Sequence, residues 1–571
     1  MAYEKNGVIG FDQQGDDDKW AFTPLTNWSA KITEEIELID SDVNELKFVI
    51  EGTLKGQPQV QLQLPAEEFL GMNWHIRYWG ATAIVYPERN AVAQVRTAIQ
   101  ELSDPRRRKL YIATGWIGND FILPGGEHET ELPQPLNHYK HATDPATESD
   151  YFALAELWNI STQKPEIGPL LALIPFRAVM GRTDFAVHIS GPSGTFKTET
   201  AALLARWFNP ALNARNAVVN WSGTANALEV IGYYGKDVIL IVDDYAPHGS
   251  ASQVAKLGEV ADRLIRSAAN AAGRTRLTSG STLQESRYPR CLILSTGEDI
   301  PPGESLRARM INLEFDTGDI DVQRLTWLQD NSAGFHRLLT SFIRWLQTKP
   351  IEHRTIQLAT RELGEGHKRH VAAQHQLEQV ARMVGQFGQE VFGIDSDTID
   401  IANEYYRQQL SVVIEKQVET TREERHIDRY INTLRELLAT KKANIANRNG
   451  GEPSRPTAMG WEWMADRHVA RGTRVGWEIA DEQVLFISPE ASWAVVQSHL
   501  RSSGQLPIQV AKNTLWKRMK DDGLLVRFDE GRERNTIRIS AEGSVKSCIA
   551  IPLDIILEEE DKENNKKDGE F

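Results

Sequence analysis

The stretch FAVHISGPSGTFKTETAALLARWF, residues 185–208, decides the fold of this 571-residue chain. An apolar strand, Phe185 to Ile189, runs into a tight loop that contains glycines, and a helix opens with Lys197 and Thr198. Backbone N–H groups of such a loop and the helix N-terminus face an anion, Lys197 reaches the outer phosphates, and Thr198 can ligate magnesium. The predicted cradle for a nucleotide consists of Gly191, Pro192, Ser193, Gly194, Thr195, Phe196, Lys197 and Thr198.

The loop departs from the usual pattern at one position. Phe196 stands where a glycine usually precedes the lysine. If that position requires a positive φ, a phenylalanine is strained there, and the loop must differ locally. Taken alone, the stretch is therefore equally compatible with an ordinary glycine-containing turn between a strand and a helix.

Two further strands favour the nucleotide interpretation. Residues 237–244, DVILIVDD, form an apolar strand that ends in paired carboxylates, which is the Walker B arrangement. We assign Asp243 to a hydrated magnesium ion and Asp244 to the attacking water. The next apolar strand, residues 291–296, ends in Ser295 and Thr296, either of which can sense the γ-phosphate or position water. An acidic turn and a hydroxyl-capped strand end are the alternatives.

Arginines follow in two groups. Arg307 and Arg309 stand just before a strand at 311–315, where one of them is expected to reach a neighbouring subunit's nucleotide as a catalytic group. Residues 263–290 hold six arginines and one acid, and glycines frame Arg274 and Arg276 in a hairpin or tight loop. Such a loop can grip the phosphate backbone of a nucleic acid. The alternatives are a basic helix end and pairing with nearby acids.

The pattern changes along the chain predict an α/β protein with an AAA+-like P-loop ATPase core built on a parallel sheet. A small α+β domain precedes this core, and a winged helix follows it. The predicted divisions are an extended arm at 1–35, the α+β domain at 36–124, a linker at 125–150, the ATPase core at 151–350, a helical region at 351–445, a second linker at 446–458, the winged helix at 459–553 and an acidic disordered tail at 554–571.

The winged-helix prediction rests on two helices, at 493–500 and 513–521, and on a hairpin that pairs 524–528 with 536–540. Lys512, Lys517 and Arg518 would lie on or near the recognition helix and contact nucleic acid. Many winged helices bind protein instead, so a protein-binding module is the alternative.

Composition and charge limit the partners, the compartment and the metal that we expect for this chain. The formal net charge is −15, so any nucleic acid must be bound by local basic patches. Two cysteines and a polar N-terminus without an apolar core predict a cytoplasmic protein with no membrane segment. The 14 histidines show no metal-binding spacing, so the expected metal is magnesium held with ATP.

The motifs together resemble a poorly characterised ATPase-helicase family of phages and integrative mobile elements, allied to cassette-chromosome, superfamily III and MCM helicases. The resemblance rests on residues 191–198, WSGTANALE (221–229), VDDYAP (242–247), ADRLIRSAAN (261–270), AGRTR (272–276), LSTGED (294–299) and SLRAR (305–309). It implies a hexameric AAA+-like motor that acts on DNA with ATP and Mg²⁺.

The leading functional prediction is an ATP-dependent DNA helicase or translocase that works as a homo-oligomeric ring in replication of a mobile element or phage. Two alternatives stay open. One is an ATP-dependent initiator or defence regulator that binds DNA through the winged helix. The other is a degenerate P-loop scaffold that does not hydrolyse ATP, which stays open because Phe196 replaces the usual glycine.

Overall fold

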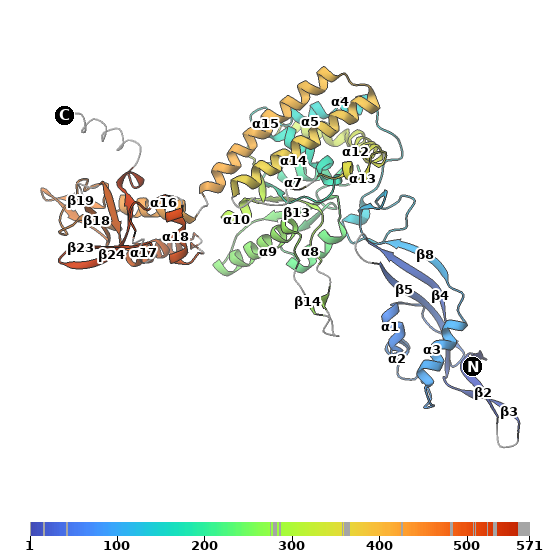
Figure 1. Cartoon of the computed structure of the whole chain (residues 1–571). Helices are drawn as coiled ribbons and strands as arrows, with labels where there is room; N and C mark the ends of the chain where they lie inside the picture. Colours follow the sequence, from blue (N-terminus) through green and yellow to red (C-terminus); the bar gives the residue numbers. More distant parts are fainter. Residues whose placement is uncertain are drawn as a thin grey trace.

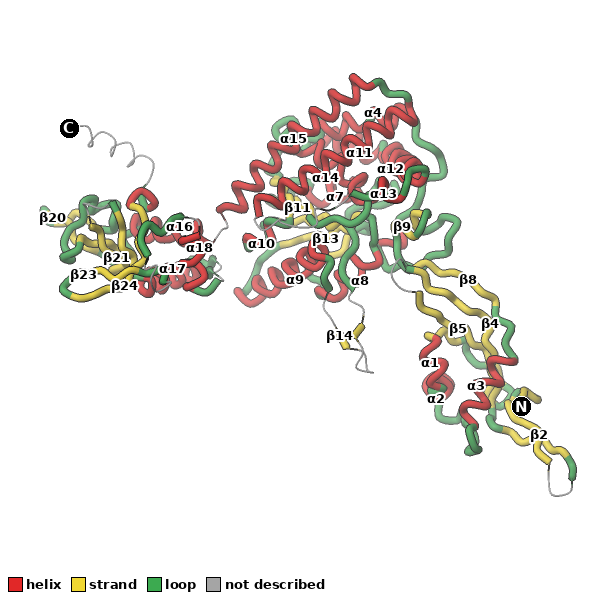
Figure 2. Tube along the Cα trace, in the orientation of Figure 1, coloured by secondary structure: helices red, strands yellow, loops and turns green. Residues whose placement is uncertain are grey.

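The structure, a computed structural model, describes residues 2–14, 18–40, 44–273, 276–277, 283–284, 287–356, 358, 366–423, 426–479, 483–505, 507–508, 510–521, 523–528 and 534–557. In sequence order the described residues form an N-terminal body rich in strands, a central α/β body and a C-terminal mixed body (Figures 1 and 2).

The central body is organised around a five-stranded sheet in which every neighbouring pair is parallel. The strand order is β12-β13-β16-β11-β17. The strands are β12 (Val218–Asn220), β13 (Ile239–Tyr245), β16 (Leu292–Gly297), β11 (Ala186–Ser190) and β17 (Met310–Glu314). This confirms the prediction of a mixed α/β protein with a parallel, P-loop-like core.

Both faces of this sheet are buried, which explains why its strands are continuous apolar runs. Side chains alternate between faces along a strand. Ile239 and Ile241 of β13 join the large core, whereas Leu240 and Val242 join a smaller core on the other face. The helices that follow the first four of these strands along the chain are α7 (Lys197–Ala205), α8 (Ala225–Tyr234), α9 (Ala251–Asn270) and α10 (Glu304–Arg307).

The large core continues into a set of helices that surrounds α6 (Ile167–Val179), every residue of which is buried. In Figure 1, α14 and α15 lie together above the sheet, whereas α8 and α9 lie below it. No helix in the described part of the chain is long and apolar enough to cross a membrane. The remaining helices of this body are α4 (Glu148–Phe152), α5 (Leu154–Trp158), α11 (Val322–Asp330), α12 (Ser332–Gln347), α13 (Ile351–Arg354), α14 (Gly366–Phe387) and α15 (Ser396–Glu423).

The predicted linker at 125–150 is wrong, because this segment is part of the central core. Leu136 and Tyr139 are fully buried. The Tyr139 hydroxyl donates a 2.8 Å hydrogen bond to the backbone carbonyl of Ile239, at the start of β13. A segment rich in glycine and proline is therefore held by tertiary contacts that local composition does not reveal.

The N-terminal body is built on a five-stranded sheet of β6 (Gln57–Pro58), β5 (Asn44–Leu54), β4 (Trp28–Ile39) and β8 (Arg106–Tyr111), with β7 (Leu62–Pro65) also paired to β5. Helices α1 (Ala66–Gly71), α2 (Trp74–Trp79) and α3 (Ala91–Glu101) accompany it. The predicted extended arm at 1–35 is wrong. Its residues form the antiparallel strands β1 (Tyr3–Lys5), β2 (Val8–Gln14) and β3 (Trp20–Pro24) and the start of β4, and they bury Ile9, Leu25 and Trp28.

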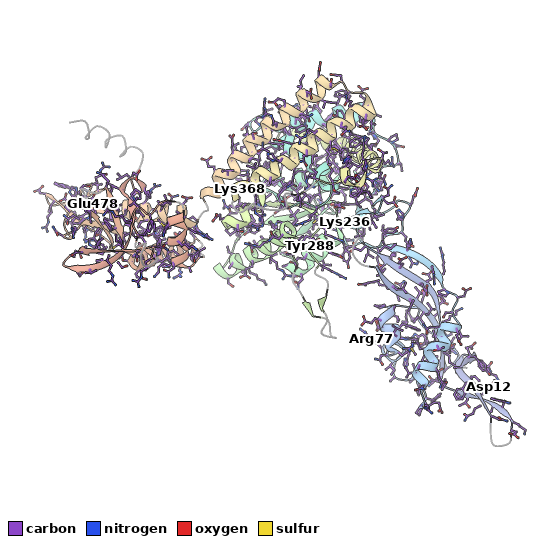
Figure 3. The ribbon with its side chains drawn as sticks, in the orientation of Figure 1. Asp12, Arg77, Lys236, Tyr288, Lys368 and Glu478 are labelled. Atoms are coloured by element: carbon purple, nitrogen blue, oxygen red, sulfur yellow. The ribbon has the colours of Figure 1, made fainter. Side chains whose placement is uncertain are left out.

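The N-terminal body joins the central body through a short hairpin, β9 (Gly115–Ile117) and β10 (Asp120–Ile122). Gly115 has φ +85°, and a Cβ there would lie 2.5 Å from the Lys236 carbonyl oxygen, so only glycine fits. The Thr114 hydroxyl donates to that same carbonyl at 2.7 Å. The Lys236 ammonium, labelled in Figure 3, pairs with Asp237 at 2.6 Å. At this junction Thr114 and Gly115 are therefore in direct contact with Lys236.

The C-terminal body begins earlier than predicted. Helix α16 (His426–Ala439) and strand β18 (Ala443–Asn447) belong to its core, so the predicted boundary at 459 and the linker at 446–458 are wrong. The core also includes Ile556 and Leu557, so the predicted tail begins too early, and residues 558–571 lie outside the described part. The other elements are β19 (Trp461–Met464), β20 (Arg467–Ala470), β21 (Thr473–Ile479), β22 (Val484–Ile487), α17 (Pro489–Ser502), α18 (Lys512–Asp521), β23 (Ile537–Ala541) and β24 (Ser544–Pro552).

The predicted hairpin of this body is displaced along the chain. Strand β23 pairs antiparallel with β24 around Glu542 and Gly543, rather than with 524–528. The five strands run in the order β18-β21-β22-β24-β23. Helices α17 and α18 precede the hairpin as predicted, but the sheet is larger than two strands.

Candidate nucleotide-binding site

The loop after β11 has the backbone that a phosphate cradle requires. Gly191 has φ +144°, and a Cβ there would lie 2.0 Å from the Phe315 carbonyl oxygen, so close approach to the end of β17 demands glycine. Gly194 has φ +86°, a conformation that L-residues rarely adopt. The Thr195 hydroxyl closes the loop by donating to the Pro192 carbonyl at 2.9 Å.

Phe196 occupies the position where strain was expected. Its φ is +64° and its ψ is 21°, which places a bulky residue in the left-handed region. The Phe196 carbonyl accepts from the Thr200 amide at 2.9 Å, so the residue still opens the first turn of α7. Its side chain is 40% exposed. The backbone at this position thus has a conformation that favours glycine, and holding a phenylalanine in it costs free energy.

Lys197 lies at the first position of α7, half-buried beside the loop. Its ammonium donates a 2.6 Å hydrogen bond to the Pro192 carbonyl. Partial burial lowers the pKa of Lys197, and the negative charges of Glu298, Asp243 and Asp244 oppose that shift. The Lys197 ammonium therefore feels the negative charge of three carboxylates.

The sheet order brings the predicted metal-binding groups together. Because β16 lies between β11 and β13, the carboxyl ends of all three strands meet at one edge. There the Thr198 hydroxyl donates to Asp243 Oδ1 at 2.8 Å, and the Thr296 hydroxyl donates to the same oxygen. The Asp243 carboxylate therefore links Thr198, in the first turn of α7, to Thr296, near the end of β16.

Asp244 lies beyond an irregularity in the sheet. The register between β13 and β16 shifts between Val242 and Tyr245, and Asp244 has φ +68°. The Asp244 amide donates to the Thr296 hydroxyl oxygen at 3.3 Å, which leaves its carboxylate exposed at the same edge. The Asp243 carboxylate is therefore hydrogen-bonded within the site, whereas the Asp244 carboxylate is open to solvent.

The donor set suits magnesium. Hydroxyl and carboxylate oxygens are the ligands that this hard cation prefers, and it usually takes one or two carboxylates together with phosphates. The described residues contain no group of three or more His, Cys, Asp or Glu that could hold a metal by themselves. The oxygens of Thr198 and Asp243 therefore fit a metal that arrives with a phosphate ligand.

Sequence reasoning missed Glu298 as a site residue. Glu298 follows β16, and its charge opposes the burial effect on the Lys197 pKa more strongly than does that of either aspartate. A 2.7 Å contact joins Glu298 Oε2 to His248 Nε2. The signal in the sequence was its place two residues after Thr296, within the motif LSTGED.

The two predicted catalytic arginines differ in their surroundings. Arg309 is buried, and its guanidinium donates to the Ser305 carbonyl at 2.6 Å and to Asn270 Oδ1 at 3.3 Å. Burial, together with the charges of nearby Arg369 and Arg266, lowers the pKa of Arg309 to about 10. These contacts hold the Arg309 guanidinium within its own chain. Arg307 is only half-buried, so it is the arginine that keeps this prediction.

The predicted nucleic-acid residues lie in two places. Arg276 belongs to β14 (Arg276–Leu277), which pairs antiparallel with β15 (Leu283–Gln284), whereas Arg274 lies outside the described residues. On α18, Lys517 and Arg518 are exposed, and Lys512 pairs with Glu490. The basic hairpin and α18 are on separate bodies.

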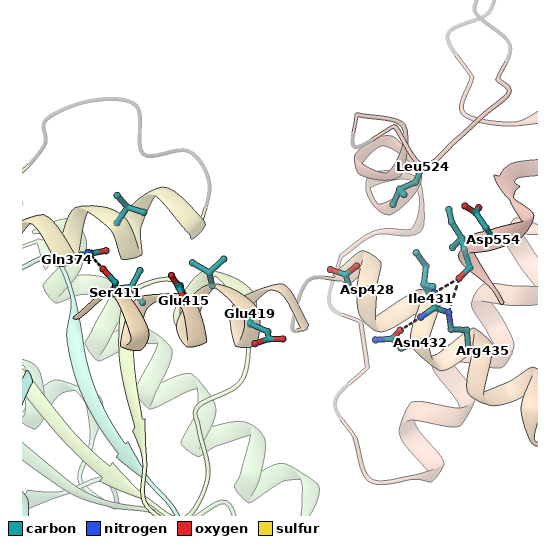
Figure 4. A pocket seen from close by; sticks show the side chains of 14 residues that line it. Gln374, Ser411, Glu415, Glu419, Asp428, Ile431, Asn432, Arg435, Leu524 and Asp554 are labelled. Carbon is teal, nitrogen blue, oxygen red and sulfur yellow. Dashed lines mark hydrogen bonds between the residues drawn. The ribbon is translucent and has the colours of Figure 1, made fainter. Parts of the chain in front are cut away.

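The acidic pocket in Figure 4 is a different site. It has a volume of about 830 Å³ and lies between α14 and α15 on one side and the C-terminal body on the other. Glu415, Glu419, Asp428 and Asp554 line it, with Arg435 as its one lining cation among the described residues. That charge does not suit phosphates, so it is not a second nucleotide site.

Comparisons with known proteins add a likeness of fold. No protein-family model and no curated protein matches the chain. The solved structure described as "SCCmec type IV Cch - active helicase" is 13% identical, covers 97% of this chain and 98% of its own, and has a TM-score of 0.50. The apo NrS-1 C-terminal region is 14% identical over 67% of this chain and 87% of its own, with a TM-score of 0.26. The chain thus resembles the first of these structures in fold.

Proposed function

We propose that this chain is an ATPase that binds ATP and Mg²⁺ at the carboxyl edge of the central sheet and acts as a DNA helicase or translocase. The observation that carries the proposal is the bonding of Thr198 and Thr296 to the single carboxylate of Asp243. Three strand ends that are distant in sequence converge there beside a glycine-containing loop and a lysine. That arrangement is what phosphoryl transfer needs, because its catalysis is mainly positioning and charge stabilisation.

The residues have distinct roles in this proposal. The loop amides and Lys197 bind the phosphates, Thr198 and Asp243 hold Mg²⁺, and Thr296 senses the γ-phosphate. The magnesium ion would supply charge neutralisation at the phosphates. Asp244, exposed at the same edge, orients the attacking water. Arg307 would stabilise the transferring phosphoryl group of a neighbouring subunit in a hexameric ring.

The proposed helicase or translocase moves along DNA. The hairpin with Arg274 and Arg276 would contact the phosphate backbone, and α18 with Lys512, Lys517 and Arg518 would act as the recognition helix of a winged-helix module. The distant fold likeness to a helicase of the SCCmec element supports a role in the replication of a mobile element or phage. The contacts would be sequence-independent at the hairpin.

Strand displacement by the purified chain tests the motor. We expect ATP hydrolysis that DNA stimulates, together with unwinding or translocation. Lys197→Ala should abolish both, because it removes the cation that reaches the phosphates. Active hydrolysis that no DNA stimulates and that drives no movement on DNA would reject the motor. Equal nucleotide affinity in the wild type and Lys197→Ala would support a scaffold without turnover.

A binding switch is the second candidate, favoured by the exposed cations Lys517 and Arg518 on a helix that follows α17. In that case the chain would be an ATP-dependent initiator or defence regulator that recognises one DNA site. Footprinting separates the two functions. A sequence-specific footprint without processive unwinding supports the switch, and protection that is independent of sequence supports the motor.

A further inference from the structure

His188 lies at the middle of β11, fully buried behind the P-loop. Its Nδ1 lies 2.8 Å from the Ser295 hydroxyl oxygen, and its Nε2 lies 3.0 Å from the Asp299 carbonyl oxygen. The indole N–H of Trp221, at the end of β12, donates to the same Ser295 oxygen at 3.0 Å. A continuous line of hydrogen bonds therefore crosses the sheet from β12 through β16 to β11 and the loop after β16.

The chemistry of these groups fixes the direction of each hydrogen bond. A backbone carbonyl only accepts, so His188 Nε2 must carry a proton and donate to Asp299. In a neutral imidazole the other nitrogen is then an acceptor, and the Ser295 hydroxyl donates to Nδ1. That hydroxyl accepts from Trp221, whose indole is a donor only. Every group in the line has a matched partner in this one arrangement.

The neutral form of His188 is the one that its surroundings favour. Burial lowers the pKa of His188 to about 4, the Asp299 carbonyl opposes that shift, and the charges of Arg307 and Lys197 add to it. Tyr245 of β13 packs its ring edge-on to the imidazole, with centroids 6.3 Å apart. An acceptor nitrogen thus faces Ser295 at neutral pH.

The two residues that His188 contacts bracket residues 296–298, which lie at the end of β16 and just after it, at the proposed nucleotide-binding edge. Ser295 directly precedes Thr296, whose hydroxyl bonds to Asp243. Asp299 directly follows Glu298, whose charge acts on Lys197. Because both ends are bonded to one buried ring, the short segment between them has little freedom to shift relative to β11.

We infer that His188 is a positioning residue for ATP hydrolysis. It fixes Thr296 and Glu298 against the P-loop strand, so that the γ-phosphate meets them in one geometry. The inference rests on the proposed function, because it assigns a role in turnover at the same site. His188 touches neither nucleotide nor metal, and it acts through Ser295 and the Asp299 backbone.

A matched pair of histidine variants tests the inference. His336 is also buried and bonds to a backbone carbonyl, that of Lys140 at 2.9 Å, but it lies in α12. We expect His188→Ala to lower kcat by about 10- to 100-fold, the usual effect of losing a group that orients a ligand-binding residue. The affinity for a nonhydrolysable ATP analogue should change little. His336→Ala should destabilise the fold and leave kcat near that of the wild type.

Coupling and backbone exchange supply two readouts that a purely structural role would not move. If His188 acts through Thr296, the double variant His188→Ala/Thr296→Ala should lose barely more kcat than Thr296→Ala alone. Amide exchange at 296–299 should accelerate in His188→Ala and not in His336→Ala. His188→Asn, which keeps an acceptor for Ser295, should recover part of both losses and serves if the alanine variant fails to fold.

The outcomes separate the two proposals. Equal kcat and equal exchange at 296–299 in the two histidine variants overturns the positioning role. Additive effects of His188→Ala and Thr296→Ala also overturn it. Absence of ATP hydrolysis in both the wild type and His336→Ala overturns the proposed function instead, and the exchange at 296–299 still decides whether His188 orders this segment.

Discussion

Asp40 and Arg290 lie 250 positions apart in the sequence and form a buried, two-pronged ion pair. Arg290 Nη1 lies 2.8 Å from Asp40 Oδ1, and Nη2 donates to Oδ2 at 2.9 Å. The same guanidinium lies over the Tyr233 ring, 3.8 Å from its centroid, and Nε donates to the Tyr233 carbonyl. One arginine, two residues before β16, therefore links the N-terminal body to the central body.

Removal of one partner of this pair should be costly. Asp40→Ala leaves the Arg290 charge buried without its carboxylate, which typically costs about 3–5 kcal/mol. We expect a lower midpoint of thermal unfolding and faster proteolysis at the junction near 112–118. Glu404→Ala, which breaks the exposed pair of Glu404 with Arg407, should lower that midpoint far less, because water screens an exposed pair. Similar effects of the two variants would contradict the anchoring role of Asp40.

Phe196 allows a test of stored backbone strain. A non-glycine residue in a sparsely populated φ/ψ region costs on the order of 1–3 kcal/mol. Phe196→Gly removes that strain, so the central body should unfold at a higher urea concentration and bind ATP at least as tightly. Phe196→Ala is the matched control, because it removes the ring and keeps the positive φ. If both variants bind and unfold alike, the ring rather than the backbone accounts for the effect.

The Thr296 hydroxyl should matter for turnover more than for binding. Thr296→Ala removes its bond to Asp243 and the acceptor for the Asp244 amide, so kcat should fall by one to two orders of magnitude. Thr296→Ser retains the hydroxyl and should remain close to the wild type. Steady-state hydrolysis with nucleotide titration provides the measurement. A matched loss in both variants would mean that packing of the methyl group, not the hydroxyl, is important.

Acid should destabilise the central body through His188. The folded pKa of His188, about 4, lies below its unfolded value of 6.5, so the unfolded chain binds the proton first as the pH falls. Its contribution is fully present above pH 6.5 and is lost between pH 6.5 and 4, a change of roughly 3 kcal/mol. Urea unfolding at pH 7, 6 and 5 should show a steeper loss in the wild type than in His188→Asn. Parallel curves would contradict this assignment.

The sequence predicted that the ends of β11, β13 and β16 meet at one edge of the sheet, because its signals are local. An apolar run that ends in a glycine loop or in paired carboxylates marks a strand end, and parallel strands bring such ends together. The residues Thr198, Asp243 and Thr296 are therefore in contact as their motifs suggested. Glu298 was missed because a glutamate after a strand is common, and only the effect of its charge on the Lys197 pKa distinguishes it.

Local composition is misleading where tertiary contacts outweigh it. Residues 125–150 are rich in glycine and proline, yet Tyr139 is buried and bonded to β13. The first 35 residues are polar overall, but Ile9 and Trp28 are buried in the core of the N-terminal body. No sequence pattern distinguishes Arg309, bonded to Asn270, from Arg307 two positions away.

Salt dependence should reveal whether α18 binds nucleic acid. Each phosphate that a lysine or arginine neutralises contributes about −0.9 to the slope of log K against log salt for duplex DNA. Lys517→Ala and Arg518→Ala should each reduce that slope by roughly one and weaken binding to all sequences alike. Lys442→Ala, an exposed lysine between α16 and β18 in the same body, is the control and should leave the slope unchanged. A slope that responds equally to all three substitutions would indicate a diffuse charge effect rather than contact through α18.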